Sequence, residues 1–121
     1  MPNSLRTSSS KNKFTAWSGD EALVNCVAGA VITITPTGDF RLMRIAMAFD
    51  ALVMPNIVIT QDNVAGAAWD QVIVDYTPLV NIQDFSFYGG VCYEYSRGNA
   101  IVITIGAVAA NVNVSWKLEQ I

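Results

Sequence analysis

The chain has 121 residues, of which 52% are hydrophobic and 14% are charged, and its formal net charge is −3 at pH 7. This length suffices for one domain with a sizeable core but not for two ordinary domains. The sequence has no histidine, which excludes the commonest zinc ligand and any Ser-His or Cys-His nucleophile pair. Because an average soluble protein is about 25% charged, we expect partner molecules to cover part of this surface.

The first 13 residues differ from the rest of the chain in charge. They hold three basic residues and no acid, whereas the remaining 108 residues hold four basic and ten acidic side chains. Rich in Ser, Asn and Thr, residues 1–13 have little to bury, and we predict a flexible basic N-terminal arm. Three residues of the arm are candidates for contact with an acidic partner or with another copy: Arg6, Lys11 and Lys13. We expect no nucleic-acid binding, because the acidic body would repel phosphate.

After the arm, turn-forming residues separate short segments of alternating apolar residues, which predicts strands. The first expected strand covers residues 14–18 and ends at Ser-Gly-Asp. Residues 22–35 give one long or two short strands, broken near Ala28-Gly29, and Pro36-Thr37-Gly38-Asp39 closes this region.

The next segment, FRLMRIAMAFDA at residues 40–51, places two arginines in an apolar run. Strict alternation assigns one set of side chains to the core: Met43, Ile45, Met47 and Phe49. It assigns the other set to the opposite side of the strand: Leu42, Arg44, Ala46 and Ala48. Arg41 then lies at the strand entrance and on a different side from Arg44. We interpret both as ordinary surface arginines, solvated or paired with acids.

The rest of the chain continues the strand pattern. Further strands are expected at 56–61, 67–76, 85–87, 91–95, 101–105 and 111–119, with turns at 62–66 and 96–99. The alternation slips between Trp69 and Val72, which indicates a bulge. Only residues 79–83 suggest a helical turn.

About eight short strands and no regular helix predict an all-β fold with a single domain over residues 14–121. We expect an antiparallel β-sandwich, jelly-roll-like because of the strand count, with an immunoglobulin-like sandwich as the alternative.

Two uncharged stretches raise the question of a membrane or a leader. Gly98 to Trp116 is long enough for a spanning helix, but Ile101, Ile103 and Ile105 alternate with smaller or polar residues, as in a strand. Residues 22–38 lack the basic flank and early position of a signal peptide. We therefore expect neither a membrane span nor a targeting segment.

Residues able to carry chemistry are few. Cys26 and Cys92 are too far apart in sequence for a Cys-x-x-Cys motif, and two free buried thiols are favoured over a disulfide. Asp62, Asp70 and Asp75 leave carboxylate chemistry formally open, but solvated surface acids explain them better. Gln61-Asp62-Asn63 is only a fragment of a calcium loop. We predict no catalytic, cofactor-binding or metal-binding residue, no small-molecule substrate, and no enzyme.

Aromatic residues offer a different kind of site. Six of them could form a platform that stacks on sugars: Trp17, Trp69, Trp116, Tyr88, Tyr93 and Tyr95. Because the tryptophans are scattered along the chain, we favour roles in the core or in an oligomer interface.

Between residues 40 and 118, several strand and turn features occur in a recognisable order: Phe49-Asp50-Ala51 at a strand end, Ile57-Val58-Ile59, Asp62 in a turn, Gly66-Ala67-Ala68, and Trp69-Asp70-Gln71-Val72. This succession resembles small β-sandwich structural proteins of tailed bacteriophages. The resemblance implies a place in the virion and carries over no catalytic residue.

Among virion roles, the low charge, the lack of helix and the basic arm favour a capsid decoration or cement protein. Such a protein, expected as a homotrimer, binds the major capsid protein on the outer shell and bridges its subunits, after synthesis in the host cytoplasm. The alternatives are a tail, neck or fibre-base component of the virion and, from a different class, a carbohydrate-binding β-sandwich or small hydrolase.

Overall fold

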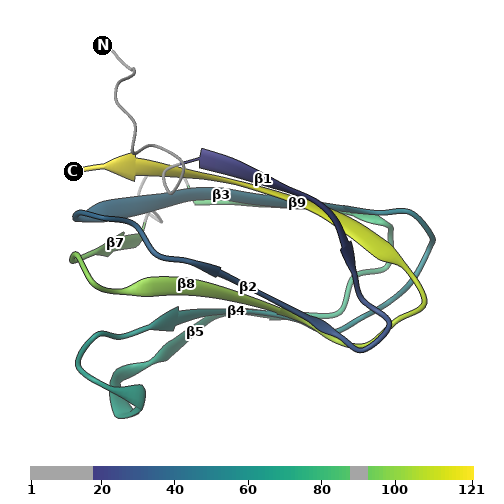
Figure 1. Ribbon diagram of the computed structural model, residues 1–121, viewed down its shortest axis with the longest axis horizontal. Coiled ribbons are helices and arrows are strands. Elements are labelled where there is room, and N and C mark those ends of the chain that lie inside the picture. Colours follow the sequence, from purple (N-terminus) through teal and green to yellow (C-terminus); the bar gives the residue numbers. More distant parts are fainter. Residues whose placement is uncertain (1–17, 88–92) are drawn as a thin grey trace.

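A computed structural model describes residues 18–87 and 93–121, with side chains from residue 24 onward. The strands form two antiparallel sheets that pack face to face (Figure 1). The first sheet, sheet A, contains in spatial order β1 (Ser18–Asn25), β9 (Asn111–Gln120), β3 (Phe40–Phe49) and β6 (Ile82–Ser86), with β7 (Tyr93–Tyr95) also paired to β3. The second, sheet B, contains β2 (Ala30–Ile34), β8 (Ala100–Ile105), β4 (Ile57–Asp62) and β5 (Gln71–Tyr76).

The strand pairing is that of a jelly roll. β1 pairs with β9, β2 with β8, β3 with β6 and β7, and β4 with β5, so the chain is a long antiparallel hairpin rolled into two layers. Among the described strands, only β4 and β5 are both consecutive in sequence and hydrogen-bonded to each other. An immunoglobulin-like sandwich contains several such hairpins, so the jelly-roll expectation is confirmed over its alternative.

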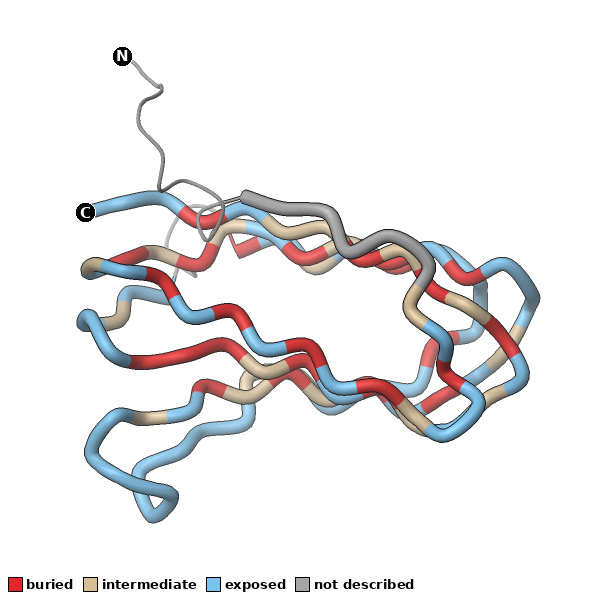
Figure 2. Tube along the Cα trace, in the orientation of Figure 1, coloured by how far each residue is buried: buried red, intermediate tan, exposed pale blue. Residues whose placement is uncertain are grey.

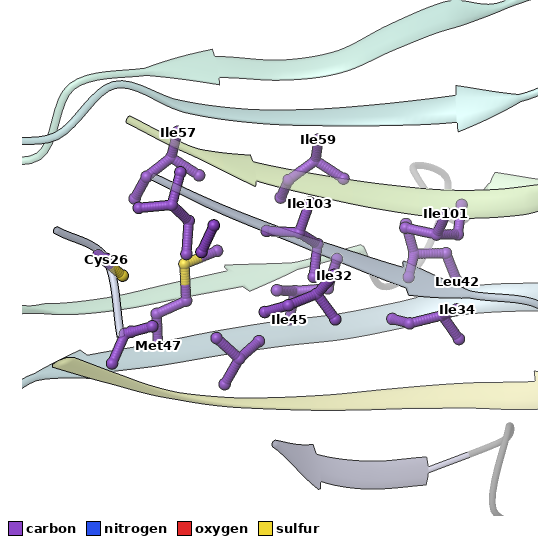
Figure 3. Packing of buried hydrophobic residues seen from close by; sticks show 14 of the residues in the cluster. Cys26, Ile32, Ile34, Leu42, Ile45, Met47, Ile57, Ile59, Ile101 and Ile103 are labelled. Carbon is purple, nitrogen blue, oxygen red and sulfur yellow. The ribbon is translucent and has the colours of Figure 1, made fainter. Parts of the chain in front are cut away.

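The core lies between the two sheets and is built from the inward side of each strand (Figure 2). Burial alternates strictly along β2, β4 and most of β8, where each isoleucine points inward. In the close-up of the core, isoleucines of sheet B pack against Leu42, Ile45 and Met47 of β3 (Figure 3). Complete burial of each such side chain contributes about 1.5–3 kcal/mol relative to exposure, so this layer holds the sheets together.

A β-bulge in β3 overturns part of the expected side-chain assignment. Phe40 and Leu42 are buried, but burial then resumes at Ile45, and the register against β9 shifts between Leu42 and Arg44. The extra residue reverses the alternation. Leu42 therefore belongs to the core, Met43 is only half-buried, and Arg41 lies on the same outer face as Arg44, not on a different one.

Three expected element boundaries were also wrong. β1 (Ser18–Asn25) runs through Ser-Gly-Asp, where the first strand was expected to end, and residues 14–17 of that expected strand lie outside the described residues. Residues 67–69 form a 3-10 turn, η2 (Ala67–Trp69), and the strand begins only at Gln71. The reason is local: Asn63 Oδ1 accepts a hydrogen bond from the Ala65 N–H, and Asp70 Oδ1 accepts one from the Asn63 N–H, so side chains compete with strand pairing. β6 begins at Ile82, within the segment expected as a helical turn.

Other expectations were confirmed in full or in part. The break near Ala28-Gly29 separates β1 from β2. A bulge does occur in β5, but it lies at Ile73, between the pairs Ile59–Val74 and Thr60–Val72, and not between Trp69 and Val72 as expected. The predicted arm, residues 1–13, lies outside the described residues. No helix in residues 18–87 or 93–121 has the length and apolar character that a membrane span requires.

Candidate interaction surface

Two arginines on the outer face of sheet A are paired with acidic side chains of neighbouring strands. Arg41 stands directly opposite Glu94 of β7 on one side and Glu119 of β9 on the other. Its Nε and Nη2 donate to Glu94 Oε2 at 3.0 and 2.7 Å, and its Nη1 donates to Glu119. These hydrogen bonds, first to Glu94 and then to Glu119, raise the pKa of Arg41. The arginine thus joins three neighbouring strands.

Arg44 makes a second pair on the same face. Its Nε donates to Asp84 Oδ1 at 3.0 Å and its Nη2 to Asp84 Oδ2 at 2.9 Å, and the hydrogen bonds from Arg44 lower the pKa of that carboxyl group. The interpretation of Arg41 and Arg44 as ion-paired surface residues is confirmed. Both arginines connect neighbouring strands of sheet A, and these ion pairs account for them without a ligand.

The outer face of sheet B has a different chemistry. Two cross-strand rows cover it: Val31, Thr104, Val58 and Asp75 in one, and Thr33, Val102, Thr60 and Val72 in the other. We call the seven uncharged members the threonine–valine face. Asp75, at the edge strand β5, is the one ionisable residue in the two rows.

The threonine–valine face arises from a repeated tripeptide. Val-Ile-Thr occurs at 31–33, 58–60 and 102–104, and these repeats lie on β2, β4 and β8. The registers align the three central isoleucines, Ile32, Ile103 and Ile59, on the inner side, so each outward valine opposes a threonine. Sequence reasoning missed this surface, although the threefold repeat of one tripeptide was a signal that could have revealed it.

Such a face is suited to burial against another protein. β-Branched side chains fit a pleated sheet and have few rotamers to lose on contact. Val31 and Val72 are 66% and 63% exposed, and covering them requires no removal of water from a charge.

A second apolar region lies where β3 leads to β4 and β5 leads to β6. These two connections are adjacent, because the Phe49 N–H donates to the Asn81 carbonyl at 2.9 Å. They expose five large apolar side chains: Leu52, Met54, Leu79, Val80 and Ile82. We call this set the connection patch. Leu79 is 75% exposed, which is a large exposed fraction for a leucine in a set of exposed apolar side chains.

The aspartates singled out in the sequence lie at three places along the β4–β5 hairpin. Asp62 ends β4, Asp70 holds the 63–70 turn through the Asn63 N–H at 2.7 Å, and Asp75 lies on the outer face of sheet B. All three are exposed. Among the residues with described positions, no three His, Cys, Asp or Glu side chains are grouped so that they could hold a metal ion.

Asp50 lines a shallow hollow of about 310 Å³ at one end of the sandwich, with Asn25, Val27, Ala109, Ala110 and Asn111. Its Oδ1 accepts from the Asn111 N–H at 2.9 Å, and its Oδ2 accepts from Asn111 Nδ2 at 3.2 Å. The carboxylate is therefore occupied in fixing the end of β3 to the start of β9.

The aromatic residues fall into separate environments. Trp116 is half-buried against the core, whereas Trp69 is 65% exposed on η2. Tyr93 and Tyr95 stack with ring centroids 6.3 Å apart, and Phe40 lies 5.4 Å from Tyr95. Burial raises the pKa of Tyr95 to about 12. The aromatics with described side chains therefore give no shared stacking platform; Trp17 and Tyr88 lie outside the described residues.

Cys26 is a buried free thiol that packs in the core. Burial, and secondarily the charge of Asp50, raise its pKa. Cys92 lies outside the described residues, as do the arm residues Arg6, Lys11 and Lys13.

The outer face of sheet A thus carries two arginines paired with acids, whereas the outer face of sheet B carries the threonine–valine face, with Asp75 at its edge. Comparisons of the chain with protein-family models, with curated proteins and with solved structures found no match.

Proposed function

We propose that this protein is a structural component of a bacteriophage virion, a capsid decoration or cement protein that binds the outer shell and bridges major capsid subunits. The observation that carries the proposal is the threonine–valine face, an uncharged sheet surface of seven β-branched residues. A surface of this kind is stabilised when it is covered, because apolar area leaves water and these seven residues carry no charge to desolvate.

Rigidity supports the same role. The face belongs to a sheet whose other side is packed isoleucine core, so its outward side chains hold fixed relative positions. A preorganised face loses little conformational entropy on binding. Many weak contacts of this kind, repeated over a shell, add up through avidity, so no single contact needs high affinity.

The remaining surfaces have roles in this proposal. The connection patch supplies contacts between copies in a homotrimer. The basic arm, through Arg6, Lys11 and Lys13, reaches acidic surface on neighbouring subunits. The major capsid protein is the principal partner, and the outer capsid surface is the location.

The test is binding to DNA-free heads. Thr60→Lys with Thr104→Lys introduces two charges into the threonine–valine face, and we expect head-bound protein to fall at least tenfold in a pelleting assay. The matched control is Ala48→Lys, which adds a lysine to an exposed position on the outer face of sheet A and is expected to bind normally.

Copy number separates the positions within a virion. A decoration protein stays with emptied heads in amounts comparable to the major capsid protein, whereas a tail, neck or fibre-base component purifies with tails in small multiples. Polysaccharide binding by the free protein, lost in Trp69→Ala, would instead favour the carbohydrate-binding alternative, because Trp69 is the more exposed of the two tryptophans with described side chains.

A further inference from the structure

The outer strands of the sandwich are not equally protected against pairing with another strand. β1 contains two acidic residues, Asp20 and Glu21, and its register shifts after Glu21. β6 has Asp84 at its centre, and β7 has Glu94. β5 carries Asp75 and a register shift against β4. Charges and bulges on edge strands are the usual means by which proteins prevent unwanted sheet extension.

β2 has none of these features. Ala30-Val31-Ile32-Thr33-Ile34 contains no charge, proline or glycine, and its register with β8 is unbroken over all five residues. In the part of the chain that the structure describes, no strand pairs with its other side. β2 is thus an uncharged edge strand, and within the described ranges its outward backbone groups have no strand partner.

We propose that the β2 edge is a contact between two copies of this chain, in which the two β2 strands pair antiparallel across a two-fold axis at Ile32. In this register Ile32 lies opposite its own counterpart, and Val31 lies opposite Thr33 of the second copy. The contact extends sheet B into one continuous sheet with four strands from each copy.

The identity of the partner follows from the side chains. Within each copy, β2 and β8 already place Val31 opposite Thr104 and Thr33 opposite Val102. The two-fold register repeats the same valine–threonine opposition, so the rows of the threonine–valine face run without interruption from one copy to the next. Residues opposite each other also lie on the same face, as antiparallel pairing requires.

Charge and symmetry favour a second copy over a foreign strand. The segment from Asn25 to Pro36 contains no charged side chain, so two identical strands meet without repulsion. Each copy has one β2 edge, and a two-fold contact uses both edges, so pairing closes at two copies and does not build a filament. The inference does not rest on the virion role, and in the proposed homotrimer the same edge would join two neighbouring trimers.

Charge substitution tests the contact and its register. Val31→Lys with Thr33→Lys puts lysine opposite lysine in both pairs across the axis, and we expect the mass measured by sedimentation equilibrium to fall to half that of the wild type. Val31→Lys with Thr33→Glu puts lysine opposite glutamate in both pairs, and we expect the wild-type mass to return. This rescue depends on Val31 facing Thr33 of the second copy.

The matched control is Val102→Lys with Thr104→Lys, which adds the same charges to the same face on the interior strand β8. It is expected to keep the wild-type mass. Circular dichroism and thermal unfolding establish that each variant is folded. If a lysine variant fails to fold, hydrogen exchange of the wild type tests the contact instead. Those amides of residues 30–34 that point away from β8 should exchange at least tenfold faster on dilution, whereas the β2 amides bonded to β8 and the amides of residues 71–76 should not change.

Three results would overturn the inference. The first is a folded Val31→Lys, Thr33→Lys variant that retains the wild-type mass. The second is a wild type whose β2 amides exchange at the same rate at every concentration. The third is loss of mass in the β8 control alone, which would mean that copies associate by stacking their faces and not by pairing their edges. None of these results affects the head-binding test of the proposed function.

Discussion

Arg44 holds the Asp84 carboxylate through two parallel hydrogen bonds of 3.0 and 2.9 Å, which tie the central strand β3 to the edge strand β6. The pair crosses the sheet diagonally, since the residue directly opposite Arg44 is Ser86. Both side chains are close to half-exposed, so solvent screens the interaction. Such pairs contribute about 0–1 kcal/mol, and the pair orders the edge strand more than it stabilises the fold.

The acid dependence of this pair follows from the lowered pKa of Asp84. Because the folded-state pKa lies below the unfolded value, the pair's contribution is present above the unfolded pKa and is lost as pH falls through the folded one. We expect Asp84→Asn to lower the free energy of unfolding by less than about 1 kcal/mol at pH 7. In urea titrations, the difference from the wild type should shrink as the pH falls through the lowered pKa of Asp84. A difference that grows on acidification would contradict this assignment.

Ile103 is central to the core, with no exposed surface, opposite Ile32 on one side and Ile59 on the other. Ile103→Ala should reduce the free energy of unfolding by about 2–5 kcal/mol, because it leaves a cavity between two packed sheets. The control is Thr104→Ala on the same strand, which points outward and should cost about 0.5 kcal/mol or less. Equal effects in urea denaturation would mean that the strand faces have been misassigned.

Gly29 adopts a φ of +81°, and a Cβ there would lie 3.2 Å from the carbonyl oxygen of Ile105. It closes the turn between β1 and β2, where its N–H donates to Cys26 O at 2.9 Å. Gly29→Ala should lower the free energy of unfolding by about 1–2 kcal/mol, because the left-handed conformation is strained for a residue with Cβ.

A second glycine provides the comparison for Gly29. Gly106 has no positive φ, and a Cβ there would meet Asn56 N at 3.4 Å, an ordinary contact. Gly106→Ala should therefore change stability by less than the Gly29 variant in the same chemical denaturation experiment. The reverse order would show that strain at Gly29 is relieved by movement of the turn.

Cys26 should react slowly with thiol reagents in the folded protein. Burial and the nearby charge of Asp50 raise its pKa, and only the thiolate reacts. In a Cys92→Ser background, maleimide labelling at pH 8 should be at least tenfold slower than that of a free cysteine, and urea should restore the ordinary rate. Rapid labelling of the native protein would place the thiol at the surface.

The sequence alone was sufficient to predict the fold class. Alternation of the Val-Ile-Thr segments predicts strands, because side chains of a strand point to opposite faces in turn. Ala28-Gly29 marks the first break for the equally local reason that a tight turn requires a glycine with positive φ. The apolar pattern also indicated an irregularity in this region, but it placed the slip between Trp69 and Val72, whereas the bulge lies at Ile73.

Other boundaries and faces were not visible locally. Met43 in the β3 bulge is as apolar as its neighbours, so nothing in the sequence marks the point where alternation reverses and carries Leu42 inward. The acid partners of Arg41 lie 53 and 78 residues away along the chain, and only the pairing of β3 with β7 and β9 brings them together.

The sequence by itself therefore determined that this protein is an all-β domain with little charge, since composition and alternation are properties of the chain. The tertiary structure decided which strands are neighbours, and with that it assembled three separate Val-Ile-Thr repeats into one uncharged face. The physical reason is that strand pairing depends on contacts between residues far apart in sequence, whose register is set by how the whole sandwich fills its core.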